Sequence, residues 1–140
     1  ELTSETKGFK EGFEVTGDST VSREGFLYSD TSCSTLTGHW KMGLTSFTVG
    51  DASGSNYKLD YTNSTIKLLA NTTTVESILE GAFRNVNLTV GEETSLPDSG
   101  EARKNLIYVT SNTVKLGDDS SSDYPSDVSD GPPEAKKTCQ

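Results

Sequence analysis

Histidine, tryptophan, methionine and cysteine are all scarce in this 140-residue chain. It contains one histidine, one tryptophan, one methionine and two cysteines. With His39 as the single histidine, neither a Ser-His-Asp arrangement nor a zinc site of several histidines can be assembled. The sequence also lacks a phosphate-binding P-loop, a dinucleotide fingerprint, paired CxxC motifs and a GxSxG elbow. We therefore expect no enzyme, no cofactor and no metal centre.

Positive charge and long apolar runs are also scarce. Twelve Lys and Arg stand against 21 Asp and Glu, which gives a formal net charge of -9. So acidic a chain repels nucleic-acid backbones and anionic membrane surfaces, and we expect neither as a partner. The longest apolar runs, such as Leu68-Leu69-Ala70, fall far short of the roughly 20 residues that span a bilayer, so no membrane insertion is expected.

Turn-forming clusters recur at regular intervals along the chain, and apolar and polar residues alternate between them. The clusters are Gly17-Asp18-Ser19, Ser29-Asp30, residues 50–54, Thr62-Asn63-Ser64, Gly91-Glu92 and Ser111-Asn112. Alternation with period two places one set of side chains on each face of a strand. The sequence therefore predicts an all-β fold, an antiparallel barrel or curved sandwich of about seven to nine strands with one short helix.

The expected strands follow from this alternation. They are residues 9–15, 20–28, 36–49, 57–61, 66–70 (pairing behind the previous strand), 83–90 and 105–110, the last turning into 113–116. In the clearest of them Leu36, Gly38, Trp40, Met42 and Leu44 share the inward parity, while His39 and Lys41 face solvent. The apolar parity then changes to residues 47 and 49, which predicts a bulge or bend near residues 43–46.

One segment breaks the strand period and predicts a helix over residues 74–80. Thr73-x-x-Glu76 has the form of a capping box, and Gly81 stands where a C-terminal cap belongs. Three apolar residues follow helical spacing: Val75, Ile78 and Leu79. We expect this stripe to pack the helix over one mouth of the barrel.

Composition divides the chain into a β domain, residues 1–117, and an acidic tail, residues 118–140, rich in Ser, Asp and Pro. Without apolar periodicity the tail is typical of a disordered segment. Its aspartates offer oxygen ligands of the kind calcium takes, but they lack EF-hand spacing and glycine. A solvated acidic tail is therefore favoured, and a calcium site is the alternative. A disulfide between Cys33 and Cys139 would tether the tail and contribute about 4–5 kcal/mol in the loop-entropy description. Two unpaired thiols are the alternative to the bridge.

Several features favour a secreted, extracellular or cell-surface location. A pair of cysteines in a small Ser/Thr-rich chain suggests an oxidising compartment. The chain begins at Glu1 without Met, as a mature product trimmed of a signal segment would, or as an arbitrary boundary would. Glycosylation sequons stand at Asn63, Asn71 and Asn87, although chance predicts about two in a chain with this many Asn, Ser and Thr. The sequons therefore carry weight only in a eukaryotic source.

The large side chains expected on the inward parity are the candidate ligand-binding residues. They are Phe13, Trp40, Met42, Tyr57, Leu59, Tyr61, Phe83 and Tyr108. Such a set ordinarily forms the core. A barrel of about eight strands can also enclose one small ligand, so the same residues are candidates for lining a cavity.

The order of features resembles a known family over residues 8–118. Its landmarks are Tyr28-Ser29-Asp30-Thr31-Ser32-Cys33, Gly38-His39-Trp40, Tyr57-Lys58-Leu59-Asp60-Tyr61, Leu106-Ile107-Tyr108-Val109 and Leu116-Gly117-Asp118. They resemble the lipocalin-like β-barrel domains of exported bacterial lipoproteins and, more distantly, the extracellular lipid-binding domain of the adenomatosis-polyposis-coli down-regulated family. The early Gly-x-Trp strand, the early cysteine and the cysteines before the last hairpin of those domains are absent here. The resemblance implies a secreted barrel that holds an apolar ligand.

Two functional hypotheses follow from the sequence. The first is a secreted, non-enzymatic binding protein with a small apolar ligand in a barrel cavity. The second is a structural or adhesive extracellular subunit, which joins protein partners or copies of itself through exposed strand edges. The size of the native particle separates them, because a monomer favours the binding protein and a polymer favours the subunit.

Overall fold

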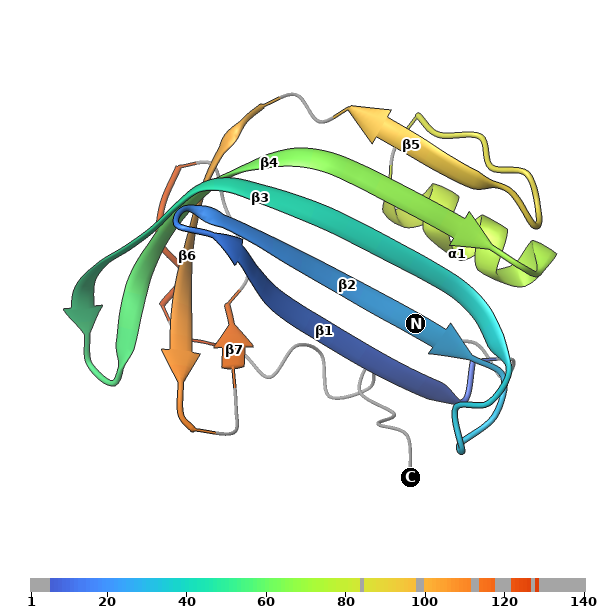
Figure 1. Ribbon diagram of the computed structural model, residues 1–140, viewed down its shortest axis with the longest axis horizontal. Coiled ribbons are helices and arrows are strands. Elements are labelled where there is room, and N and C mark those ends of the chain that lie inside the picture. Colours follow the sequence, from blue (N-terminus) through green and yellow to red (C-terminus); the bar gives the residue numbers. More distant parts are fainter. Residues whose placement is uncertain are drawn as a thin grey trace.

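The computed structural model describes residues 6–83, 85–97, 100–111, 114–117, 122–126 and 128. Seven strands and one helix are formed by these residues (Figure 1). In chain order they are β1 (Gly8–Gly17), β2 (Thr20–Tyr28), β3 (Leu36–Ser53), β4 (Asn56–Ala70), α1 (Thr73–Ala82), β5 (Glu93–Pro97), β6 (Ala102–Val109) and β7 (Val114–Leu116). The sequence expectation for residues 20–28 coincides with β2.

All seven strands belong to one antiparallel sheet, in the order β1-β2-β3-β4-β6-β7, with β5 paired to β4. β4 is long enough to take two partners in succession: residues 57–62 pair with β6 and residues 65–69 pair with β5. The sheet curls into a half-barrel, in which β6 and β7 run crosswise to the direction of β1 and β2 (Figure 1). The prediction of an antiparallel all-β fold with one short helix is confirmed.

The curl has a local cause in β3 and β4. Their pairing shifts register between Gly43 and Leu44, again between Thr45 and Thr48, and again before Ala52. Ser46, inside the second irregularity, has a left-handed φ of 52°. Each bulge bends the strand and increases its twist. The bend predicted near residues 43–46 is therefore confirmed.

One face of the sheet, here called the inner face, carries two apolar clusters. The first joins Leu27, Leu68 and Ala70 to Val75 and Leu79 of α1 and to Val86 and Leu88. The second consists of Val21, Leu44, Leu59, Tyr61 and Ile107. Trp40 packs against the first cluster and Met42 against the second, so the inward parity predicted for β3 is confirmed.

The helix lies where the sequence predicts it, but its caps differ. Thr72, not Thr73, is the N-cap: its backbone is extended, and its side chain accepts a hydrogen bond from the Val75 amide at 3.2 Å. Gly81 lies inside α1, and Phe83 is the C-cap. Val75 and Leu79 are buried against the inner face near the end of β4, whereas Ile78 belongs to the outward side of the helix.

The strand expected over residues 83–90 is wrong. Residues 85–90 form an irregular connection, and the next strand begins at Glu93. Its alternation is real, because Val86 and Leu88 are both buried in the first cluster. The Leu88 amide donates to the Glu80 carboxylate at 2.7 Å instead of to a neighbouring strand. The apolar residues of this stretch thus close the inner face without joining the sheet.

The turns expected at residues 50–54 and at Thr62-Asn63-Ser64 are also misplaced. β3 runs to Ser53, and β4 continues without interruption through residues 62–64. The segments 57–61 and 66–70 therefore do not pair with one another but are successive parts of one strand. β3 pairs with β4 before and after the bulges, with Leu44 opposite Asn63 and Thr45 opposite Thr62. This pairing keeps the polar residues 62 and 63 in the sheet.

Candidate functional site

The middle of the inner face, between the two clusters, is dominated by Trp40. Its cross-strand neighbour on β2 is Gly25. A Cβ atom built on Gly25 would fall 2.3 Å from the Trp40 Nε1 atom and 2.4 Å from Cε2. The indole therefore lies across the backbone of β2, in space that only a glycine leaves open.

A charged pair borders this indole. Arg23 of β2 donates through Nε to the Glu11 carboxylate of β1, and both side chains are 33% exposed. The Arg23 guanidinium carbon lies 5.6 Å from the centre of the Trp40 ring, within the range of a cation–π contact. The direct strand neighbours of Arg23 are Phe13 and Met42.

These five residues, Glu11, Phe13, Arg23, Trp40 and Met42, are called the midline site. Phe13, Trp40 and Met42 are all only partly buried. The midline site thus offers apolar surface on both sides of a guanidinium, a cation that stays charged at every physiological pH. Such an arrangement suits an apolar molecule, and an acidic group on that molecule could share the guanidinium with Glu11.

The structure brings only part of the candidate ligand-binding set together. Phe13, Trp40 and Met42 gather at the midline site. Leu59 and Tyr61 are buried within the second cluster, and Phe83 packs against the first. These last three residues serve the core.

Two candidates do not belong with the others. Tyr57 is 46% exposed, because it lies near the beginning of β4 beyond the cluster. Tyr108 lies on the opposite face of the sheet from its neighbour Ile107, which is buried in the second cluster. Three consecutive large side chains, Leu106-Ile107-Tyr108, left the alternation ambiguous at this point. Leu106 is buried on the outer face, so burial there does not follow one parity.

Sequence reasoning missed the partners of His39. The ring is half-buried on the outer face, stacked on Phe26 with ring centres 4.5 Å apart. Its Nε2 atom lies 3.0 Å from a Glu24 carboxylate oxygen. The cross-strand register places Phe26 opposite His39, a relation that the sequence of one strand does not reveal. Among the described residues, no group of three or more His, Cys, Asp or Glu is placed to hold a metal ion.

The sequons and cysteines have different environments. Asn63 is only 5% exposed, so the folded chain leaves no room for a glycan there. Asn71 and Asn87 are exposed, and the side-chain Nδ2 atom of Asn71 donates to the Leu36 carbonyl at 3.2 Å. Cys33 has a left-handed φ of 55° beside the Asp30 turn. Cys139 lies outside the described residues, so the disulfide stays a prediction.

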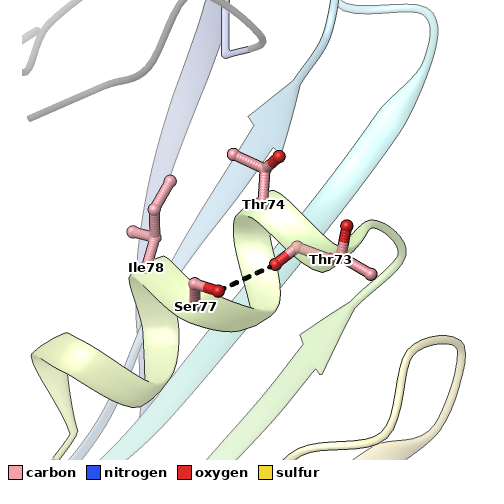
Figure 2. A pocket seen from close by; sticks show the side chains of 4 residues that line it. All are labelled: Thr73, Thr74, Ser77 and Ile78. Carbon is pink, nitrogen blue, oxygen red and sulfur yellow. Dashed lines mark hydrogen bonds between the residues drawn. The ribbon is translucent and has the colours of Figure 1, made fainter.

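Two surface hollows accompany the described fold. Figure 2 shows the first, of about 450 Å³, on the outward side of α1, where it is lined by Thr73, Thr74, Ser77 and Ile78. The Ser77 hydroxyl donates to the Thr73 carbonyl at 3.1 Å, so it is already used by the helix. The second hollow, of about 380 Å³, lies over β2, β3 and β4 on the outer face.

No known family matches the chain, and no curated protein shows significant sequence similarity to it. In the part of the chain that the structure describes, no helix has the length and apolar character needed to cross a bilayer.

Proposed function

We propose that this chain is a secreted or cell-surface, non-enzymatic binding protein that holds a small apolar ligand at the midline site. The observation that carries the proposal is the partial burial of Phe13, Trp40 and Met42 between two closed apolar clusters. Covering such surface contributes roughly 25 cal/mol for each Å² of apolar area removed from water. A ligand would join the two clusters into one continuous core.

The charged pair at the midline site narrows the class of ligand. Arg23 and Glu11 remain one-third exposed, so water has access to both groups. An apolar ligand with a terminal acidic group would replace that water at the guanidinium. The resemblance to lipocalin-like domains supports the same kind of ligand, and we propose it as the family with which this chain shares its function.

The test uses 1-anilinonaphthalene-8-sulfonate, an apolar probe with one acidic group. We expect the probe to quench the fluorescence of Trp40, the one tryptophan, with saturable binding. Arg23→Gln should weaken binding by about tenfold, because it removes a charge-assisted contact. Lys7→Gln, which changes the charge equally at an exposed residue, should leave the affinity unchanged.

Urea unfolding of each variant is the control. A cooperative transition shows that the variant is folded and that the probe is not binding to a loosened core. Absence of Trp40 quenching in the folded protein, or equal affinities for Arg23→Gln and Lys7→Gln, would exclude the midline site.

The alternative, a subunit that assembles through strand edges, has its own supporting observation. β1 pairs with β2 alone among the described strands, and its Val15 side chain is 69% exposed. An open strand edge with an exposed apolar residue can add a strand from another chain. Native mass spectrometry of the full chain decides: a monomer at micromolar concentration rejects the subunit, and a ladder of oligomers supports it.

A further inference from the structure

The outer face carries a hollow that the midline site does not involve. It has a volume of about 380 Å³, within the range of small-molecule pockets, and spans β2, β3 and β4. Its wall consists mainly of hydroxyl-bearing residues, among them Ser22, Ser64 and Thr65. Two lysines, Lys41 and Lys67, complete it.

The two lysines face each other across the sheet. Lys41 of β3 and Lys67 of β4 are direct cross-strand partners. Like charges directly opposite one another destabilise a sheet, unless something of opposite charge lies between them. Lys67 has such a partner in Glu93, at 3.3 Å. The Lys41 ammonium makes no ion pair or hydrogen bond with any described residue.

Thr16, Thr20 and Thr45 of the lining already form hydrogen bonds through their hydroxyls, but three other hydroxyl groups of the hollow do not. Ser22 is only 8% exposed, yet its hydroxyl forms no hydrogen bond with another described residue. The same is true of the Ser64 and Thr65 hydroxyls within that part of the chain. Gly43 keeps them accessible, because a Cβ atom there would lie 2.6 Å from the Ser64 Oγ atom and 3.0 Å from the Thr65 Oγ1 atom. Each hydroxyl can donate one hydrogen bond and accept others, so a ligand that reaches these three groups gains hydrogen bonds from them.

Nearby carboxylates limit what can bind. Glu14 is the strand partner of Ser22, and Glu24 is the partner of Lys41, although His39 contacts the Glu24 carboxylate. With Glu93 beside Lys67, the surroundings of the hollow have little net positive charge. A long polyanion would be repelled by the acidic remainder of the molecule. A small anion would be repelled less, because it contacts only the Lys41 ammonium and the hydroxyls.

We propose that this hollow is a second binding site, for a small oxyanion or for the phosphate, sulfate or carboxylate group of a small molecule. The Lys41 and Lys67 ammonium groups provide charge, and the hydroxyls of Ser22, Ser64 and Thr65 donate hydrogen bonds to the oxygens. The site is independent of the midline site, which lies on the other face of the sheet. Each of the two proposals can therefore fail alone.

The test is a titration of the ¹⁵N-labelled full chain with inorganic phosphate, sulfate and acetate in separate arms at constant ionic strength. We expect saturable shifts of the Ser22, Gly43 and Thr65 amide signals in at least one arm. Comparison of the arms shows whether a tetrahedral or a planar oxyanion is preferred.

Two variants locate the site. Lys41→Met keeps the aliphatic stem and should weaken binding by about tenfold. Ser22→Ala should weaken it severalfold while the fold is retained. Lys7→Met changes the net charge equally outside the hollow and should bind as the unmodified chain does. Shifts that never saturate in any arm, or equal binding by Lys41→Met and Lys7→Met, would overturn the proposal.

Discussion

Gly25 is a single residue on which the arrangement of the inner face depends. Its missing side chain lets the Trp40 indole lie across β2, beside Arg23. Gly25→Ala would place a methyl group within 2.6 Å of three indole atoms. We expect it to destabilise the protein by about 2–3 kcal/mol, since overpacking forces side chains and backbone to shift. Urea unfolding followed by Trp40 fluorescence measures the change.

Gly81→Ala is the matched control. No atom lies within 4 Å of the position its Cβ would take, and Gly81 lies within α1. This variant should be stabilised by roughly 0.5–1 kcal/mol, because alanine loses less backbone entropy in a helix. If the urea midpoint of Gly25→Ala is no lower than that of the unmodified chain, the position of the Trp40 indole does not require a glycine at residue 25.

Asp30 makes stability depend on pH in the acidic range. Hydrogen bonds from the Ser32 hydroxyl and from the Ser34 and Thr35 amides hold the pKa of the Asp30 carboxyl well below its usual value. A lowered folded pKa means that the stabilisation is complete above the unfolded pKa, about 3.9, and is lost as pH falls below it.

Comparison with Asp30→Asn isolates this contribution from those of the other carboxylates. The urea midpoint of the unmodified chain should exceed that of Asp30→Asn at pH 6, and the gap should narrow between pH 4 and pH 2. The same measurement on Asp18→Asn, a carboxyl with no hydrogen-bond partner in the described part of the chain, should show no gap. A gap that stays constant with pH would show that the loop does not depend on the charge of Asp30.

At the scale of elements, α1 is defined by a cap one residue earlier than the sequence pattern indicates. Thr72→Ala should destabilise the protein by about 1 kcal/mol, because the Val75 amide loses its acceptor. Thr73→Ala, on the exposed side of the first turn, should change stability by less than about 0.5 kcal/mol. Urea unfolding of both variants compares the caps. The reverse order of effects would restore Thr73 as the N-cap.

β4 shows why the ends of a strand are harder to predict from the sequence than its presence. Both of its apolar halves were identified as strand from alternation alone. The Thr62-Asn63-Ser64 sequence, however, favours a turn on local grounds. In the sheet these residues stay extended, because β3 lies along one side of β4 while β6 and β5 succeed one another along the other. Tertiary pairing overrides local preference here.

At the scale of the whole molecule, Tyr124 joins the C-terminal segment to the outer face of the sheet. Its hydroxyl donates to the Asp60 carboxylate at 2.6 Å, and this bond raises the pKa of the Tyr124 phenol. The Lys58 and Lys104 ammonium groups lie 5.0 Å and 4.7 Å from the centre of its ring. Tyr124, which follows β7 in the chain, thus lies against β4 and β6.

Tyr124→Phe keeps the ring and removes the hydrogen bond. We expect limited proteolysis in the segment around residue 124 to become roughly three- to tenfold faster, as for loss of one charge-assisted bond. Tyr57→Phe removes a phenol hydroxyl from an exposed tyrosine and should leave the rate unchanged. Equal rates for all three proteins would mean that the Asp60 contact does not hold the segment.

The sequence by itself determined the antiparallel all-β class, the inward parity of β3, the bulge near residues 43–46 and the existence of α1. Each of these rests on the period of neighbouring side chains, which is local information. Only the tertiary structure decided the two partners of β4, the burial of Val86 and Leu88 without a strand, the outward position of Tyr108 and the meeting of Lys41 with Lys67. These features depend on the register between strands far apart in the chain. Alternation along one strand does not contain that register, because every shift by two residues preserves the same pattern.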